Sequence, residues 1–265
     1  MSGGPTSHAG LIRRMRLLAA LACVLLLGAC ATGPNANPAD PLEPWNRGVY
    51  KFNDTLDRNL LKPVATVYRD TTPELVRKGV GNFFGNLEDA WTLVNSVLQL
   101  KGQAAAESLT RFWVNTLMGL GGVLDVASEM QIPRHSEDFG QTLGYWGVGA
   151  GPYVVLPVLG PSTLRDTAAL QAEWRGDLVT HIDDIPTRNS LIVVRGVHKR
   201  ANLLKQEGLL EQAALDKYTF LRDAYLQHRR NQVYDGNPPD EPMPEDVEPT
   251  EGDGQAEPGA AAPAR

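Results

Sequence analysis

Apolar side chains recur at helical spacing along most of the chain. The first such set is Trp45, Val49, Phe52, Leu56 and Leu60. Steps of three and four residues place side chains on one face of a helix, so this set predicts an amphipathic helix. The prolines at 41 and 44 suit the start of this helix, and Pro63 is expected to end it.

Two more helices follow from the same pattern. One is predicted over residues 72–100, with Thr72 as its cap and Pro73 in its first helical position. The next spans about 103–117 and stops at the glycine-rich run 119–122. The later part of the first of these helices is apolar on more than one face.

The pattern changes between residues 132 and 160, where glycine and proline break any long helix although the segment stays apolar. Compact turns pressed against other backbone or against a ligand are expected there. Helical spacing then resumes over about 161–174, 191–206 and 212–230, where Ser162 is expected to cap the first of the three helices. Strands are rare in this pattern, which predicts an all-α single domain.

The extra apolar faces of residues 72–117 allow two interpretations. A central helix packed on all sides would bury them within the protein. Alternatively, the domain has a second apolar surface, which lies in the interface of a bilayer or encloses a lipid-sized cavity. The pattern alone favours neither interpretation.

The N-terminal segment predicts export. Arg13, Arg14 and Arg16 precede an apolar stretch, Leu17 to Leu27, that suits a signal peptide and is too short to span a bilayer. Small residues at 28 and 29 then lead to Cys30, and this tetrapeptide resembles the lipobox of bacterial lipoproteins. Residues 1–29 are therefore predicted to be a signal, and 30–39 a linker whose Cys30 thiol carries lipid.

Composition narrows the remaining possibilities. The second cysteine, Cys23, lies inside the signal, so the mature chain can form no internal disulfide. Residues 236–265 are rich in Pro, Gly, Glu and Asp, which predicts a disordered acidic tail. This tail has eight acidic residues and one arginine, a net charge of −7, against a formal net charge of −6 for the whole chain. The body, residues 40–235, is nearly neutral, which argues against nucleic acid as a partner.

No sequence motif for catalysis or metal binding stands out. The glycines at 147, 149 and 151 lack the spacing of a phosphate-binding loop, and no nucleophile elbow is present. Two clusters could hold a metal ion, one around His135 and one around His181, but solvated loop groups are the favoured interpretation. We therefore expect no metal, no cofactor and no enzymatic activity. Arg165 and Asp166 are expected to form a structural ion pair.

Longer motifs are spread over residues 40–166 of the body. They are Asp40–Arg47 (DPLEPWNR), Asn82–Leu87 (NFFGNL), Arg111–Thr116 (RFWVNT), Gly119–Ala127 (GLGGVLDVA), Glu137–Gly144 (EDFGQTLG), Gly149–Pro157 (GAGPYVVLP), Gly160–Ser162 (GPS) and Arg165–Asp166 (RD). In this order they resemble the MlaA (VacJ) family of outer-membrane lipoproteins. The acidic tail is not part of the resemblance.

The resemblance implies an all-helical, ring-like protein embedded in the inner leaflet of the outer membrane and anchored on its periplasmic face. Such a protein removes phospholipids that have strayed into the outer leaflet and passes them through an amphipathic channel. The implied partners are phospholipid, a trimeric porin and a soluble periplasmic lipid carrier. Transport of this kind maintains lipid asymmetry and involves no covalent chemistry.

Two sets of residues become site hypotheses on this interpretation. The first is a bilayer-contacting surface made by Phe83, Phe84, Trp91, Leu98, Phe112 and Trp113. The second is a channel wall made by Phe139, Gly144, Tyr145, Trp146, Gly149, Gly151 and Tyr153. Ordinary core packing is the alternative for each aromatic residue. If Gly149 and Gly151 hold positive-φ or tightly packed conformations, β-branched replacements there should abolish transport.

Two rival functions remain open. A structural lipoprotein could use its apolar face to bind another protein, and it would carry no lipid. A lipid-processing enzyme would need a nucleophile and a base, which the sequence does not display. The structural role is the stronger of the two rivals.

Overall fold

A computed structural model describes residue 37 and residues 40–213 and 216–240. The signal segment with Cys30, and the tail beyond residue 240, lie outside the described residues. The elements in chain order are α2 (Glu43–Leu56), the π-helical segment η1 (Asp57–Leu61), α3 (Lys62–Thr71), α4 (Glu74–Leu98), α5 (Gly102–Leu117), α6 (Val126–Glu129), α7 (Phe139–Tyr145), β1 (Tyr153–Leu156), β2 (Gly160–Thr163), α8 (Leu164–Gly176), the 3-10 segment η2 (Leu178–His181), α9 (Ile185–Ala213) and α10 (Lys217–Val233).

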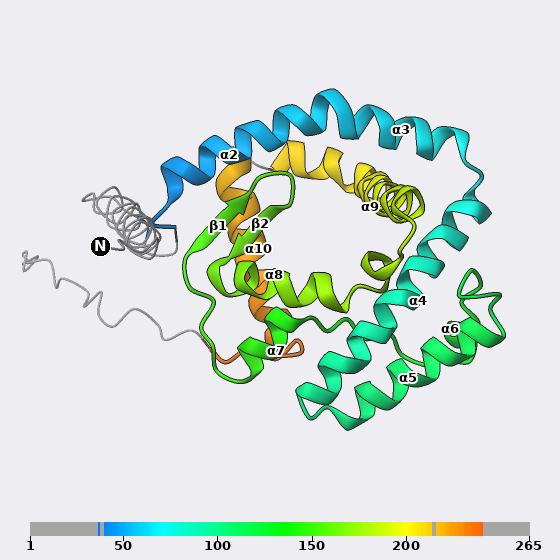
Figure 1. The fold of residues 1–265 in the computed structure, drawn as a ribbon. Helices are drawn as coiled ribbons and strands as arrows, with labels where there is room; N and C mark the ends of the chain where they lie inside the picture. Colours follow the sequence, from blue (N-terminus) through cyan, green and yellow to red (C-terminus); the bar gives the residue numbers. More distant parts are fainter. Residues whose placement is uncertain (1–36, 38–39, 214–215, 241–265) are drawn as a thin grey trace, which may run out of the picture.

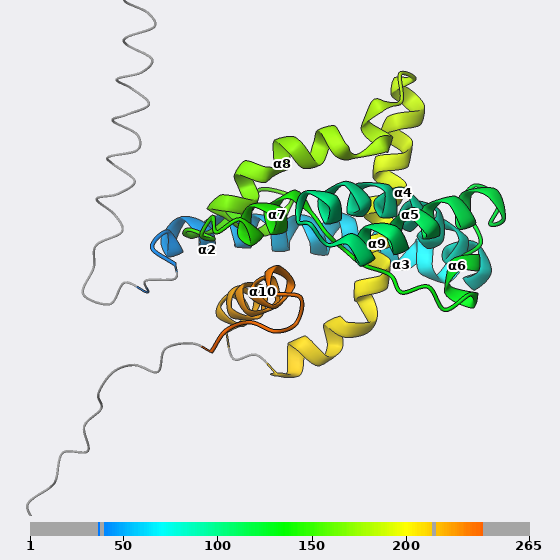
Figure 2. The ribbon, with the colours of Figure 1, turned by 90° about the horizontal axis from the view of Figure 1, so that it is seen from below.

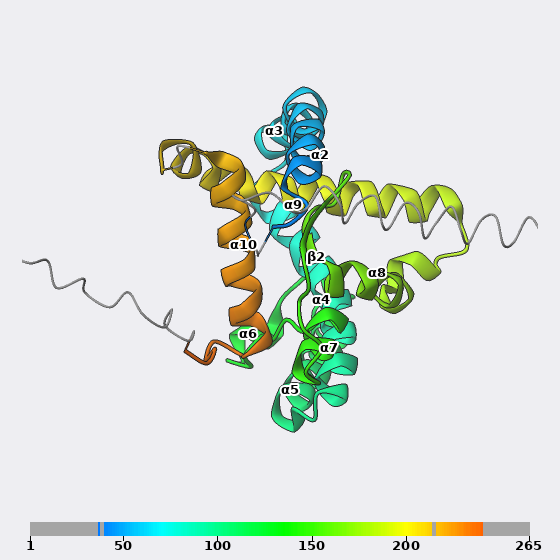
Figure 3. The ribbon, with the colours of Figure 1, turned by 90° about the vertical axis from the view of Figure 1, so that its left-hand side faces the viewer.

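The elements form a flat ring (Figure 1). The rod α2–η1–α3 makes one side, α4 makes the next with α5 folded back along its outer edge, and α7 with the β1–β2 hairpin closes the rest. Seen from its edge, the ring is a single layer crossed by α9 (Figure 2). The α8 side of this layer and the α10 side are opposite faces (Figure 3). The prediction of a ring-like, mainly helical domain is confirmed.

The first helix does not end at Pro63, as predicted. It runs on through η1 into α3 and ends at Thr71. Pro63 stands in the first turn of α3. The wider π-helical turn before it accommodates the ring and the missing N–H that would otherwise break a helix. The break comes at Thr72, whose extended backbone is the conformation that the following Pro73 favours.

The predicted helices at 72–100 and 103–117 are confirmed as α4 and α5. The predicted cap by Thr72 is wrong, because no side chain caps the start of α4. The two helices turn back on each other at Leu100, whose φ of 59° is left-handed. This tight turn makes α4 and α5 an antiparallel hairpin.

The glycine- and proline-rich segment contains more regular structure than expected. Asp138 caps α7 by accepting a hydrogen bond from the Gln141 N–H at 2.8 Å. In the antiparallel hairpin that follows, Tyr153 faces Thr163 and Leu156 faces Gly160. The amide of Asn46 on α2 completes the edge of β1: it donates to the Tyr153 carbonyl at 3.0 Å and accepts from the Val155 N–H at 2.8 Å.

The last three helices are confirmed, with shifted boundaries. Ser162 was expected to cap α8, but it lies in β2, and Thr163 is the cap, accepting from the Asp166 N–H at 3.2 Å. The helix α9 begins before the predicted residue 191 because Asp184 accepts a hydrogen bond from the Thr187 N–H at 2.8 Å. Asp216 caps α10 in the same way.

Candidate functional site

The seam between α4 and α5 is polar. On α4 the buried face carries Asn86, Asp89, Thr92, Asn95 and Ser96, and on α5 it carries Ser108, Arg111 and Asn115. Across the described residues, buried polar and charged side chains outnumber buried hydrophobic ones. A water-soluble domain normally has the opposite distribution.

Arg111 is the centre of this polar seam and is 1% exposed. Its guanidinium donates to the Ile132 carbonyl at 2.7 Å and to Asp125 Oδ1 at 2.8 Å. Its Nε lies 3.5 Å from Asp89 Oδ2, and burial raises the pKa of the Asp89 carboxyl. Arg111 therefore ties the loop after α5 to the helix hairpin through buried charges.

The exposed surface around this seam is apolar. We call it the apolar rim. It consists of Leu75, Val76, Val94, Val97 and Leu98 on α4, Leu109, Trp113 and Leu117 on α5, and Met118, Leu120, Val123 and Leu124 beyond α5. Leu75 is 81% exposed and Leu120 is 75% exposed. Large apolar side chains gathered in this way indicate a surface that is covered in the working protein.

The predicted bilayer-contacting residues are divided by the structure. Leu98 and Trp113 are exposed and belong to the apolar rim, while Phe83 and Phe112 are half-buried. Phe84 is only 4% exposed, so its place in the predicted set is wrong: its side chain is part of the packing between α4 and its neighbours.

Trp91 also leaves the predicted bilayer-contacting set. It is half-buried, and its indole N–H donates to Glu173 Oε2 at 2.7 Å. A Cβ at Gly176 would lie 2.3 Å from the Trp91 ring, so glycine is what lets α8 approach this indole. Trp91 thus joins α4 to α8.

The predicted channel wall is not brought together. Tyr153 is 1% exposed because it packs in the core beside the rings of Tyr218 and Tyr225, at 6.4 and 6.1 Å. Gly149 has open space around it and no positive φ, so neither condition for a required glycine holds there. Gly151 does need glycine, because its φ is +68° and a Cβ would lie 3.1 Å from Leu164.

The other predicted wall residues have varied positions. Tyr145 and Trp146 are exposed, and the Trp146 indole donates to the Leu98 carbonyl at 3.0 Å. A Cβ at Gly144 would lie 2.7 Å from the Arg165 guanidinium. Phe139 is half-buried, and its backbone N–H donates to Glu173.

A different set of residues encloses a cavity of about 330 Å³ between α7, the β hairpin, α8 and α10. We call it the amphipathic cavity. Its lining combines the apolar residues Leu156, Leu159, Pro161, Ala169 and Leu170 with Gly140 and the polar residues Asp138, Ser162, Asp166, Glu173, Tyr225 and Arg229. Both parts of an amphipathic ligand find matching surface in it.

Arg229 on α10 organises the polar end of the cavity. It donates to both Asp138 carboxylate oxygens at 2.6 Å and to Asp166 at 2.9 and 3.0 Å. Burial by itself would raise the pKa of both carboxyls. The hydrogen bonds and charge of Arg229 outweigh burial and hold each pKa below its usual range. Gly140 leaves room for this network, since a Cβ would lie 2.4 Å from Asp166 Oδ1.

The predicted Arg165–Asp166 ion pair is confirmed at 3.0 Å. Sequence reasoning missed the rest of the network. Asp138 and Asp166 both stand in the motifs given above, whereas Arg229 lies beside His228 and Arg230 in a helix with no motif of its own. Only the folded chain brings Arg229 to them.

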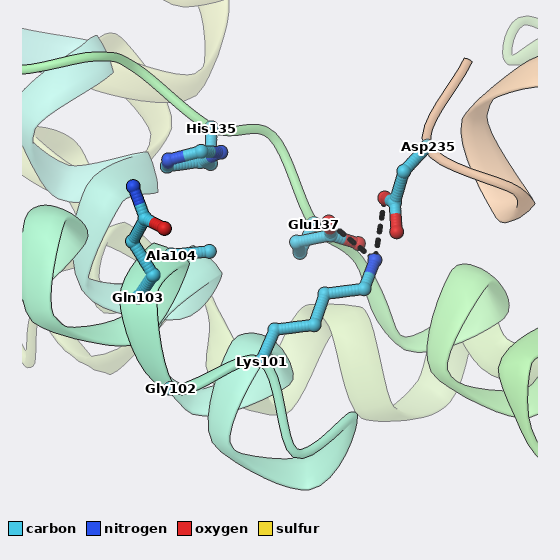
Figure 4. Close-up of a pocket in the computed structure, with 7 residues that line it drawn as sticks. All are labelled: Lys101, Gly102, Gln103, Ala104, His135, Glu137 and Asp235. Atoms are coloured by element: carbon cyan, nitrogen blue, oxygen red, sulfur yellow. Dashed lines mark hydrogen bonds and ion pairs between the residues drawn. The ribbon is translucent and has the colours of Figure 1, made fainter. Parts of the chain in front are cut away.

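The acidic and histidine clusters considered for metal binding have other partners. Figure 4 shows Lys101 reaching between Glu137 and Asp235, with Nζ–O distances of 2.9 and 2.5 Å. His135 lies apart from them and pairs with Glu107 at 2.5 Å. Lys101 thereby links the α4–α5 turn to the end of α10, beside a polar cavity of about 490 Å³.

A helical ring with a polar seam, an apolar rim and an amphipathic cavity defines a class of protein built to hold amphipathic molecules. Residues 38–232 match the family model of the MlaA lipoprotein. The chain belongs to the MlaA lipoprotein family.

Named relatives and a solved structure agree with this assignment. The chain is 39% identical over 221 residues to the intermembrane phospholipid transport system lipoprotein MlaA of Escherichia coli, covering 81% of this chain and 87% of that one. The protein of the same name from Haemophilus influenzae is 32% identical over 242 residues, covering 87% and 96%. A solved structure, described as the structural basis for maintenance of bacterial outer membrane lipid asymmetry, superposes with a TM-score of 0.65 at 37% identity. It covers 75% of this chain and 99% of that one.

Proposed function

We propose that this chain is the outer-membrane lipoprotein of an intermembrane phospholipid transport system. It removes phospholipids that have strayed into the outer leaflet and passes them through the ring toward the periplasm. The observation that carries the proposal is a reversed distribution of polar and apolar side chains. Polar side chains fill the α4–α5 seam, while the apolar rim surrounds it and an amphipathic cavity lies within the ring.

Transfer of the apolar rim from water to hydrocarbon drives the embedding. Each Leu, Val or Trp side chain contributes about 1.5–3 kcal/mol when it is fully removed from water. Arg111 and Asn115 of the seam pair with Asp125, and Asn86 pairs with Thr116, as a bilayer requires of polar groups. Among the described residues, no helix has both the length and the apolar character to cross a bilayer. We place the ring flat within one leaflet, where the apolar rim meets hydrocarbon.

The two faces of the ring suggest an orientation. The end of α8, η2 and the start of α9 project from one face, where Trp174, Leu178 and Ile185 are exposed (Figure 2). The helix α10 covers the opposite face, which carries Arg222 and Arg229 in ion pairs (Figure 3). We place the first face toward the bilayer and the α10 face toward the periplasm.

Lipid on Cys30 supplies the second attachment. Cys30 lies ten residues before Asp40, and an extended segment of that length reaches about 33 Å. One acyl chain alone binds a membrane only marginally, whereas several chains together with embedded helices give a stable anchor. Cys30→Ala should therefore abolish function even though the ring is intact.

The amphipathic cavity, at about 330 Å³, suits the headgroup and the first part of the acyl chains of a phospholipid in passage. Its leucines offer an apolar wall for acyl chains, and the Arg229 network offers polar groups for the headgroup. Leaving a charged headgroup in hydrocarbon costs several kcal/mol, so a polar path through the ring lowers the barrier to transfer. No covalent step is part of this function.

Outer-leaflet phospholipid in a strain that lacks this gene is the direct test. Surface phospholipid should rise on deletion and return to normal with the wild-type chain but not with Cys30→Ala. Leu159→Arg and Leu170→Arg, which put a bulky charge in the cavity, should also fail to restore asymmetry. Gln227→Arg is the control, because Gln227 is exposed on α10 and does not line the cavity.

Suppose instead that deletion leaves lipid asymmetry unchanged and that the wild-type chain is found at the outer membrane. That result would favour a structural lipoprotein that uses its apolar rim to bind a partner. A trimeric porin and a soluble lipid carrier are the proposed partners, and both should co-purify with the full chain from crosslinked cells.

A further inference from the structure

The amphipathic cavity contains more negative than positive side chains. Asp138, Asp166 and Glu173 line it, against the single lining cation Arg229. Arg229 is fully used by the two aspartates, and Arg165 pairs with Asp166 as well. Among the described residues, no cation forms an ion pair with Glu173.

Glu173 stands where a ligand in the cavity can reach it. On α8 the residues Asp166, Ala169, Leu170 and Glu173 recur at three- and four-residue steps, so one face of the helix forms that wall. Two neutral donors hold the Glu173 carboxylate, the Trp91 indole at 2.7 Å and the Phe139 backbone N–H. Each carboxylate oxygen can accept two hydrogen bonds, so acceptor positions remain open.

Burial raises the pKa of the Glu173 carboxyl, and a cationic ligand group beside it would stabilise the charged form. A divalent metal would need several oxygen or nitrogen ligands, and no group of three suitable side chains occurs in the part of the chain that the structure describes. A primary ammonium needs fewer protein ligands than a metal ion does. It carries three N–H donors and is satisfied by one carboxylate with other acceptors nearby. Leu156, Leu159 and Leu170 then lie within the same cavity for apolar chains.

We propose that Glu173 selects phospholipids whose headgroup bears a primary ammonium, the ethanolamine class, over anionic phospholipids. The inference rests on the proposed function and adds the substrate class to it. The ammonium approaches the Glu173 carboxylate, and the acyl chains lie against the leucines of the cavity. A glycerol headgroup gains no such contact, and its net negative charge meets the excess of carboxylates.

Photolabelling tests this directly. The purified full-length protein is placed in vesicles of mixed ethanolamine and glycerol phospholipids, with a trace of a photoactivatable analogue of one or the other. Labelled peptides of α8 and the β hairpin are quantified. The wild-type chain should label more with the ethanolamine probe, and Glu173→Gln should lower that preference about fivefold, the loss of one partly exposed ion pair of about 1 kcal/mol.

Two variants separate charge from packing. Glu88→Gln removes the same charge from an exposed α4 residue that pairs with Lys199 outside the cavity, and it should leave the preference unchanged. Trp91→Phe removes a hydrogen bond to Glu173 without removing its charge, and it should keep most of the preference. If Trp91→Phe lowers the preference as much as Glu173→Gln, packing is the cause and the inference is wrong.

An N-acetylated ethanolamine probe tests the same point without any substitution, and therefore does not depend on the variants folding. The wild-type chain should label with it no better than with the glycerol probe. Equal labelling by the ethanolamine, N-acetylated and glycerol probes would overturn the inference but leave phospholipid transport standing. No cavity labelling by any phospholipid probe would count against the proposed function itself.

Discussion

Two halves of the ring are stabilised in different ways. Where α2, the β hairpin and α10 meet, the core is conventional, with Val49, Tyr153, Val155 and Tyr218 packed together. In the α4–α5 hairpin the seam is polar and the apolar side chains face outward.

The difference teaches that the α4–α5 hairpin suits an apolar solvent, whereas α2 combines a packed inner face with exposed apolar residues such as Trp45 and Phe52. An apolar core with a polar exterior is stable beside water, whereas a polar seam with an apolar exterior is stable beside hydrocarbon. The predictions below test this contrast, from the largest expected effect to the smallest.

Removal of Arg111 should have the largest effect on the hairpin. Arg111→Met leaves Asp89 and Asp125 without their buried partner, which should lower the free energy of unfolding by about 3–5 kcal/mol. Denaturant unfolding of the purified protein in detergent measures this. Adding Asp89→Asn should recover part of the loss. No recovery would show that the buried charges are not the cause.

Truncation of a side chain in the conventional core should lower the free energy of unfolding by about as much as the removal of Arg111. Tyr153→Ala removes a ring that is 1% exposed and should lower the free energy of unfolding by about 3–4 kcal/mol. Leu117→Ala on the apolar rim is the contrast, since Leu117 is 73% exposed and its loss should cost less than about 0.5 kcal/mol in the same assay. A similar cost for both would mean that the rim is packed in the protein itself.

A charge on the apolar rim should weaken embedding without unfolding the ring. A lysine in hydrocarbon costs about 2.5–3.5 kcal/mol at the bilayer centre and less near the interface. Leu117→Lys with Leu120→Lys should therefore reduce labelling of α5 by a lipophilic carbene reagent in outer-membrane vesicles. Gln227→Lys, on an exposed position of α10, is the control and should change nothing.

Acid should destabilise the protein through the Arg229 network. The pKa values of Asp138 and Asp166 are lower in the folded than in the unfolded chain, so their stabilisation is present above an ordinary carboxyl pKa of about 4. It is lost as the pH falls through the folded values. Unfolding free energies measured from pH 7 down to about pH 3 should fall less steeply in Arg229→Met. An equal slope in both chains would contradict this.

Alanine substitutions at Gly149 and Gly151 should have the smallest effect on stability. Gly151→Ala forces a side chain into a backbone with φ of +68°, which should cost about 1–2 kcal/mol. Gly149→Ala should be neutral, because that position has open space. Thermal unfolding of the two variants side by side measures the difference.

Local patterns predicted most of the helices because their causes are local. The three- and four-residue spacing around Val49, and the glycines that follow α5, act within a few residues of themselves. The details that were predicted wrongly depend on structure that the spacing of apolar residues does not report. A π-helical turn carries the first helix past Pro63, and packing against Tyr218 and Tyr225 takes Tyr153 out of the predicted channel wall.

The sequence alone determined the helical class, the membership that its long motifs indicate, and an excess of apolar faces on residues 72–117. It left open whether those faces were buried or exposed, because periodicity reports which residues share a face and not what covers it. Only the tertiary structure decided that α4 and α5 turn polar faces toward each other. It also decided that Asp138, Asp166, Glu173 and Arg229 meet in one cavity, since residues up to 91 positions apart become neighbours only when the ring closes.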